Sequence, residues 1–179
     1  MGIYEIVMEI AGATAMWTRP DTGDCPVSYP APTYSAVKGI FESILWGPAI
    51  MIFPTRVEIC APVQYHNYQT NYGGPLRKAR VIEGGGGFQL LATVLIDVCY
   101  RLYAEVLPVP REQKGRLPYT AHQWDRKTTS PGHAYQEIFY RRLKKGKCFT
   151  TPFLGWKEFG PNYFGMFRED TKIQRDLDM

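Results

Sequence analysis

The chain has 179 residues, of which 45% are hydrophobic and 14% aromatic, and its formal net charge is +4. This length and composition predict one folded domain with a proper core and exclude an intrinsically disordered chain. No apolar run approaches the roughly 20 residues needed to cross a bilayer. The N-terminus also lacks the basic and apolar blocks of a secretory signal. We therefore expect a cytoplasmic protein with no membrane partner.

The metal-binding and redox-active residue types are scattered along the chain. The four cysteines contain no Cys-x-x-Cys pair, and the three histidines are equally dispersed. A zinc site needs clustered thiolates or imidazoles. The glycine run 84–87 is followed by a strand-like segment and has no Lys-Ser/Thr after it, so it is not a P-loop. We predict reduced thiols, no metal and no cofactor.

The sequence of the first third of the chain predicts one strand, then a helix, then two further strands. Residues 3–10 alternate imperfectly and continue as a strand towards Trp17. Apolar residues recur at helical spacing over 33–46, with Thr33 as N-cap and a Gly-Pro stop directly afterwards. Residues 50–53 and 56–63 are expected to be strands interrupted by proline.

Residues 64–88 break any regular pattern in our interpretation. They contain tyrosines, asparagines and a Gly-Gly-Pro turn. Two alternatives stay open: a surface hairpin with ordinary amphipathic tyrosines, or an excursion that contacts RNA. In the second, tyrosine rings would stack on unpaired bases while Arg77 and Lys78 meet phosphates.

The second half predicts a long central strand and a basic helix. Residues 88–106 form the longest apolar segment, and Asp97 within it is either a structural or a catalytic carboxylate. Residues 131–145 predict a helix with cations in its C-terminal half. Between residues 111 and 148 there are ten Lys/Arg against three Asp/Glu. These cations either complement the helix dipole at a solvated face or contact phosphates.

The order of these elements predicts an α+β fold. A β-α-β-β-α-β series is typical of a ferredoxin-like (RRM-like) domain, in which two helices cover one face of an antiparallel sheet. Irregular Gly/Pro-rich insertions would interrupt it. We place this domain at residues 1–163 and expect 164–179 to be a short C-terminal tail or an edge strand.

Three blocks of sequence resemble a known family. They are TRP followed by VSYPAPTYSAVKGIFESILWGPAI (18–50), LIDVCYRLYA (95–104) and GKCFTTPFLGWKEF (146–159). The blocks are similar, in the same order, to those of the fifth CRISPR-associated (Cas) family, type I-C branch. That family belongs to the repeat-associated mysterious protein (RAMP) superfamily.

The resemblance implies a role in antiviral defence. Members of the family are Cascade surveillance-complex subunits that hold the 5′ handle of crRNA. They contact the large subunit and the first backbone subunit, and act on target DNA through the complex. In the I-C branch the protein usually also cuts precursor RNA without metal, by attack of a 2′-hydroxyl on the adjacent phosphate. Such cutting needs a proton acceptor, a proton donor and a cation.

The family's catalytic tyrosine position is Leu45 here. Because leucine cannot exchange a proton, we expect a non-catalytic subunit that caps the 5′ handle. The alternative is an endoribonuclease of the same fold that uses His133, Tyr135 and Lys145. A generic RNA-binding module outside CRISPR would require all three blocks to be coincidental. The candidate RNA-binding residues are Arg19, Lys38, Arg77, Lys78, Arg141, Arg142, Lys144 and Lys145.

Overall fold

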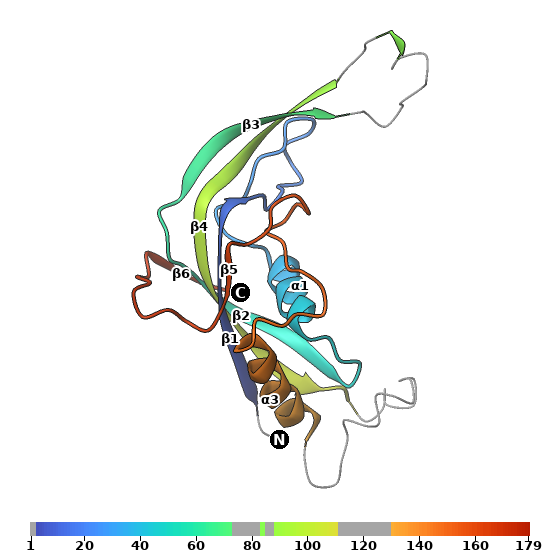
Figure 1. The fold of residues 1–179 in the computed structure, drawn as a ribbon, viewed down its shortest axis with the longest axis vertical. Coiled ribbons are helices and arrows are strands. Elements are labelled where there is room, and N and C mark those ends of the chain that lie inside the picture. The colour runs from blue at the N-terminus through green and yellow to red at the C-terminus, as the bar shows by residue number, and fades with distance from the viewer. Residues whose placement is uncertain (1–2, 73–82, 85–87, 111–129) are drawn as a thin grey trace.

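The computed structural model describes residues 3–72, 83–84, 88–110 and 130–179, so Arg77 and Lys78 lie outside the described residues. The chain is α+β, as predicted from its sequence (Figure 1). Its elements are β1 (Tyr4–Ala15), α1 (Tyr34–Ile44), β2 (Ile50–Ile59), β3 (Gln64–Tyr72), β4 (Phe88–Pro108), α3 (Pro131–Leu143), β5 (Tyr163–Gly165) and β6 (Arg175–Asp178).

The sheet has the strand order β5-β1-β4-β2-β6, and all of its pairings between named strands are antiparallel. Two β-α-β halves, β1-α1-β2 and β4-α3-β5, place β1 and β4 side by side at its centre. Both helices lie on the same face of the sheet (Figure 1). The predicted ferredoxin-like domain with an antiparallel sheet and two helices is confirmed.

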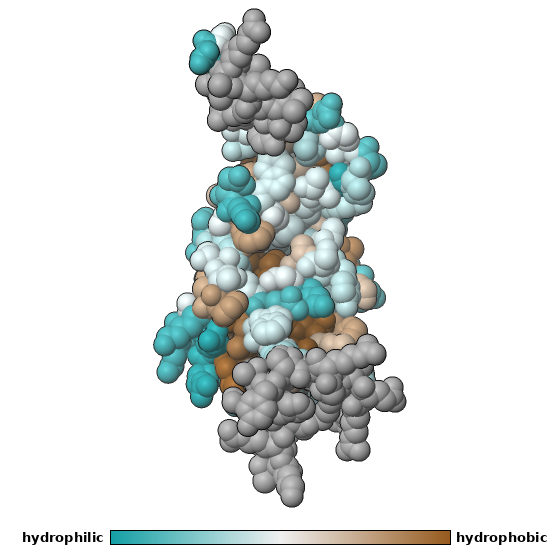
Figure 2. Space-filling view, turned by 90° about the vertical axis from the view of Figure 1, so that its right-hand side faces the viewer, coloured by the Kyte–Doolittle hydropathy of each residue, from teal (hydrophilic) through white to brown (hydrophobic). Residues whose placement is uncertain are grey.

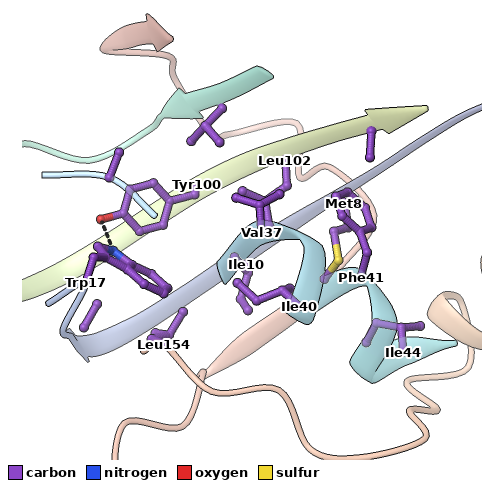
Figure 3. Close-up of a cluster of buried hydrophobic side chains, with 14 of the residues drawn as sticks. Met8, Ile10, Trp17, Val37, Ile40, Phe41, Ile44, Tyr100, Leu102 and Leu154 are labelled. Carbon is purple, nitrogen blue, oxygen red and sulfur yellow. Dashed lines mark hydrogen bonds between the residues drawn. The ribbon is translucent and has the colours of Figure 1, made fainter. Parts of the chain in front are cut away.

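The core forms between α1 and the centre of this sheet. Val37, Ile40 and Phe41 are buried on one face of the helix. They pack towards apolar side chains of β1 and β4, among them Met8 and Leu102 (Figure 3). Burying a side chain of this size stabilises the fold by roughly 1.5–3 kcal/mol. The core therefore fixes the position of α1, whose exposed side is left for other contacts.

The helix ends differ slightly from the predicted ones. Thr33 is the N-cap of α1, as expected, and its hydroxyl accepts a hydrogen bond from the Ala36 N–H. The helix ends at Ile44, two residues early, because Leu45 is already extended at φ −150°. Its counterpart α3 begins after the Ser130 cap and ends at Leu143 instead of residue 145.

Two predictions about strands were wrong. β2 is continuous, because a register shift between Pro54 and Arg56 absorbs the proline without ending the strand. Residues 64–72 are not irregular: they form β3, which pairs with β4 from Gln64↔Ile96 onwards. Its side chains are mostly exposed and polar, so it lacks the apolar alternation by which strands are detected. The described part of residues 64–88 therefore favours a surface hairpin over an irregular excursion.

β4 is the longest strand, with 21 residues, and it changes partner along its length. Its C-terminal half pairs with β2, whereas its N-terminal half pairs with β3 and curves away from the sheet (Figure 1). At this change Asp97 has φ 53°, a left-handed conformation that is uncommon for residues other than glycine. Asp97 is exposed and lies at the base of the β3–β4 hairpin.

The last residues of the chain close both edges of the sheet. β5 pairs with β1, and β6 pairs with β2 as an exposed edge strand. The connection between them is anchored by Glu9, which is fully buried and accepts hydrogen bonds from Arg168 and Thr171. The edge-strand alternative for this segment is confirmed, while the domain boundary after residue 163 stays a prediction.

Candidate nucleic-acid interface

The segment 146–159, which we call the 146–159 loop, runs from the end of α3 across the exposed side of α1. Gly146 adopts φ 61° and turns the chain directly after the helix. The backbone N–H groups of Phe149 and Thr150 then both donate to the Ser43 carbonyl, at 2.7 and 3.0 Å. The C-terminal turn of α1 thus holds the beginning of the loop through its otherwise unpaired carbonyl groups.

The far end of the loop is held against the end of β1. Gly155 has φ 92°, and a Cβ atom there would lie 1.8 Å from the Met16 carbonyl oxygen, so only glycine fits. The Met16 N–H donates to the Leu154 carbonyl at 2.9 Å. The indole N–H of Trp156 donates to the Thr18 hydroxyl at 3.1 Å. These contacts fix the loop at both ends.

Two hollows follow the loop. The α1 groove has a volume of about 480 Å³ and is lined by α1 and by the first part of the loop. The hairpin groove has a volume of about 560 Å³ and lies between the loop and the β3–β4 hairpin. Both are lined by Phe153 and Gly155. They therefore adjoin and form one surface feature, which we call the loop groove.

Aromatic side chains are concentrated along the loop groove. Trp46, Phe149 and Phe153 line the α1 groove and are 54%, 68% and 42% exposed. Tyr68 and Trp156 line the hairpin groove, with ring centroids 6.5 Å apart. Tyr68 and Trp156 are partly buried, whereas exposed rings such as those of Trp46, Phe149 and Phe153 can stack on unpaired nucleobases, each contributing roughly 1–3 kcal/mol. The groove is suited to single-stranded nucleic acid.

Cations gather where the 146–159 loop leaves α3. Four exposed residues form this group, which we call the basic rim: Arg141, Lys144, Lys145 and Lys147. Figure 2 views the side that carries the helices, where brown apolar surface lies in a hollow between paler and teal side chains. A row of cations beside an aromatic groove provides phosphate contacts next to base contacts.

Three other predicted RNA-binding residues within the described ranges have partners inside the protein. The Arg142 guanidinium donates to the Ile44 carbonyl at 3.0 Å and so caps α1. Lys38 pairs with Glu42 at 3.8 Å, beside the α1 groove. Arg19 pairs with Asp21 at 2.6 Å, and the hydrogen bonds from Arg19 hold the pKa of this carboxyl below its usual value. The described members of the predicted set thus fall into two groups. Arg141, Lys144 and Lys145 belong to the basic rim. The remaining three, Arg19, Lys38 and Arg142, have partners within the protein.

The predicted catalytic residues do not meet among the described residues. His133 lies in the first turn of α3, whereas Lys145 lies beyond its last turn. At about 1.5 Å per residue the two backbones are about 18 Å apart. Tyr135 is fully buried, and its hydroxyl donates to the Leu45 carbonyl at 2.5 Å. Burial also raises the pKa of Tyr135, so a catalytic role does not fit this position.

Leu45 is itself buried at the end of α1, where its side chain belongs to the hydrophobic core and its carbonyl accepts from the Tyr135 hydroxyl. The imidazole of His133 packs edge-on against the Tyr4 ring, with centroids 5.8 Å apart.

Among the described residues no group of three His, Cys, Asp or Glu could hold a metal ion. No helix in the described ranges is both long and apolar enough to cross a bilayer. Within the described ranges, the predicted catalytic side chains of His133, Tyr135 and Lys145 are not brought together in one site.

Sequence reasoning missed three aromatic residues of the loop groove: Trp46, Phe149 and Phe153. Of the tyrosines after residue 63, for which stacking was one of the two alternatives, Tyr68 lines the hairpin groove. For Trp46 and Phe153 the overlooked signal was an aromatic residue next to a glycine or proline in a loop, where no helical or strand period would bury it. Trp46 lines the same groove as Phe149 and Phe153 only because the tertiary fold brings them together, which the sequence does not show.

Comparisons with known proteins identify the family of the chain. The profile of the family described as CRISPR-associated protein (Cas_Cas5) matches residues 5–172. Two relatives, each 30% identical, are described as CRISPR pre-crRNA endoribonuclease Cas5d. The Thermus thermophilus protein aligns over 88% of this chain but 62% of its own length. The Mannheimia succiniciproducens protein aligns over 94% of this chain and 75% of its own length. The chain thus spans less than two thirds of the Thermus relative.

Solved structures share the fold. One described as a crystal structure of a CRISPR-associated protein has a TM-score of 0.65 at 20% identity, covering 95% of this chain and 70% of that one. Another, described as a CRISPR RNA-guided surveillance complex, has a TM-score of 0.52 at 15% identity, covering 88% and 60%. The family profile leaves only the first four and the last seven residues unmatched. The chain belongs to the CRISPR-associated protein (Cas_Cas5) family.

Proposed function

We propose that this protein is the crRNA-binding subunit of a type I, subtype I-C, CRISPR Cascade surveillance complex, in which it caps the 5′ handle of the guide RNA. The observation that carries the proposal is the loop groove with its adjoining basic rim. Unpaired bases of the handle would stack on the aromatic side chains, and its phosphates would meet the cations. Binding of the handle in this way needs no metal and no chemical step.

The salt dependence of RNA binding should show whether the basic rim contacts phosphates. Each phosphate contact on single-stranded RNA contributes roughly −0.7 to the slope of log K against log salt. The variant Lys144→Glu/Lys145→Glu should bind a labelled 5′-handle RNA of the cognate repeat more weakly and with a slope about 1 to 2 units smaller. Fluorescence anisotropy at several salt concentrations measures both quantities.

Lys172→Glu is the matched control for this variant. Lys172 is exposed and follows Thr171, whose hydroxyl donates to Glu9 on the sheet. A single charge reversal there, half of that in the rim variant, should leave the salt slope unchanged. If Lys172→Glu weakened binding as much as the rim variant, the effect would come from net charge, and the proposed handle site would be incorrect.

The second candidate function is a metal-independent pre-crRNA endoribonuclease. The names of both 30%-identical relatives favour it. The absence of tyrosine at position 45 and the separation of His133 from Lys145 weigh against it. We infer a binding role as the primary function, with maturation of the RNA by another enzyme.

A cleavage assay in excess EDTA separates the two candidates. The non-catalytic subunit should bind the cognate repeat RNA without cutting it. Cutting at one position that His133→Ala abolishes would establish the endoribonuclease. In that case Tyr135→Phe should cut at the wild-type rate, because the Tyr135 hydroxyl lies in the core.

The partners follow from the same proposal. With the handle bound, the protein would contact the first backbone subunit and the large subunit of Cascade, and would meet target DNA only through the complex. Co-purification with these subunits should require the guide RNA. The cytoplasm, where crRNA is assembled, is the proposed location.

A further inference from the structure

Two cysteines face one another where the β3–β4 hairpin leaves the sheet. The last matched pair of β2 and β4 is Ile59↔Tyr100, so Cys60 lies directly opposite Cys99. The Cys60 N–H donates to the Cys99 carbonyl at 2.8 Å. Hydrogen-bonded antiparallel neighbours have Cα atoms about 5.5 Å apart. A disulfide accepts Cα distances of roughly 4.4–6.8 Å, so the backbone geometry permits one here.

The two thiols are in contact and have different surroundings. Both residues are partly exposed. Interaction with the Cys99 side chain lowers the pKa of Cys60, and a backbone hydrogen bond from Arg101 and the positive charge of Arg101 act in the same direction. The same thiol pair, burial and the Glu9 carboxylate raise the pKa of Cys99. The Cys99 thiol donates to the buried Glu9 carboxylate at 3.7 Å, and this neighbouring negative charge disfavours the Cys99 thiolate. Cys60 is therefore assigned as the first nucleophile and Cys99 as the resolving thiol.

We propose that Cys60 and Cys99 form a reversible thiol-modification site that hydrogen peroxide converts into a disulfide. The Cys60 thiolate attacks the O–O bond, giving a sulfenic acid and hydroxide, which is protonated to water. The Cys99 sulfur then attacks the sulfenic sulfur, and the S–S bond forms as the hydroxyl group leaves with the Cys99 proton as a second water. Two thiols are oxidised and one peroxide is reduced; a dithiol reverses the reaction.

The position of the pair gives the modification a structural consequence. Cys99 lies two residues after Asp97, where β4 exchanges β2 for β3 as its partner. The disulfide would tie the end of β2 to β4 at the base of the hairpin (Figure 1). It would also remove the hydrogen bond that the Cys99 thiol donates to Glu9. Oxidation should therefore restrict the hairpin and loosen the contact between Cys99 and the Glu9 cluster.

The test uses the whole chain and reads mass instead of RNA binding. Reduced protein is treated with hydrogen peroxide, unreacted thiols are alkylated with N-ethylmaleimide, and intact mass is measured. Two of the four cysteines should become resistant to alkylation, and dithiothreitol should restore labelling of all four. Digestion without reduction should give one cross-linked peptide pair that contains Cys60 and Cys99.

Matched variants decide whether the pair is specific. Cys60→Ser and Cys99→Ser should each abolish the cross-linked pair, while Cys25→Ser and Cys148→Ser should retain it. The peptide map of the wild-type protein needs no variant, so misfolding of a serine variant does not weaken the test. Retention of four alkylatable thiols, or linkage through Cys25 or Cys148, would overturn the proposal. Neither result depends on whether the protein binds crRNA.

Discussion

Glu9 is a fully buried carboxylate on the central strand β1, surrounded by donors from the end of the chain. Its Oε1 accepts from the Arg168 guanidinium at 2.5 Å and from the Thr171 hydroxyl at 2.9 Å. Burial alone would raise the pKa of Glu9, but these hydrogen bonds and the charge of Arg168 outweigh it and lower the pKa below 4.5. The ionised carboxylate is thus the stabilising form.

Replacing Glu9 by glutamine should therefore destabilise the protein by about 2 kcal/mol at neutral pH, since charged hydrogen bonds of this kind contribute roughly 1.5–3 kcal/mol each. A group with a lowered folded-state pKa stabilises above its ordinary pKa, and this contribution is lost as the pH falls through the folded-state pKa. The unfolding free energies of the wild type and of Glu9→Gln, measured with urea, should therefore converge as the pH falls below 4.5.

The control for this comparison is Glu5→Gln, because Glu5 lies on the same strand with an exposed side chain. Its unfolding free energy should stay within about 0.5 kcal/mol of the wild type at every pH. A difference between Glu9→Gln and wild type that persisted unchanged at low pH would show that lost packing, and not the carboxylate charge, explains the effect.

Gly155 is the residue on which the path of the 146–159 loop depends most. An alanine there would need φ 92° and would place Cβ against the Met16 carbonyl. Gly155→Ala should lower the thermal midpoint by the equivalent of roughly 1–3 kcal/mol or more and should weaken RNA binding. Gly160→Ala, where no heavy atom lies within 4 Å, should change neither measurement. Equal effects of the two substitutions would contradict the role assigned to Gly155.

At the scale of elements, α3 has two different functions in its last turn. Arg141 is exposed and belongs to the basic rim, whereas Arg142 is half-buried and caps the C-terminal carbonyl groups of α1. Cations at a helix C-terminus also interact favourably with its dipole. The adjacent arginines therefore provide a matched pair of variants.

Arg142→Ala should reduce the unfolding free energy by roughly 1–2 kcal/mol, because a hydrogen bond from a charged group to α1 is lost. Arg141→Ala should leave stability within about 0.5 kcal/mol of the wild type but reduce the salt slope of RNA binding. Chemical denaturation and anisotropy measure the two effects. The opposite result, in which Arg141→Ala destabilises the protein and Arg142→Ala reduces the salt slope, would contradict the roles assigned to these two arginines.

The elements that the sequence predicts well are those with a strong apolar period. The face of α1 with Val37 and Phe41 and the apolar run of β4 are confirmed in type and near their predicted ends. β3 was missed because its neighbours in the sheet, not its own side chains, determine its conformation. The bulge after Pro54 depends in the same way on pairing with β4.

At the scale of the whole molecule, the site could be predicted only in part. Charge density indicated the basic rim, because Lys144 and Lys145 are adjacent in sequence. The aromatic half of the loop groove, with Trp46 beside Phe149, exists only after α1 and the loop meet. The Cys60–Cys99 pair is likewise separated by 39 positions, which conceals it from motif analysis.

The central claim is that RNA lies along the loop groove on the helix-bearing side. Alternate residues of β1 point to opposite faces of the sheet, so Ile10 faces the helices while Glu9 faces the connection between β5 and β6. Phe167 in that connection packs under the Arg101 guanidinium, 4.7 Å away. Aromatic residues on the two faces therefore distinguish the possible binding surfaces.

The most direct measurement is ultraviolet cross-linking of the bound 5′-handle RNA to the full chain, followed by peptide mass spectrometry. The account predicts RNA adducts on peptides that contain Trp46, Phe149, Phe153 or Trp156, and their loss in the Lys144→Glu/Lys145→Glu variant. Adducts confined to the opposite face, on peptides with Tyr163 or Phe167, would contradict it.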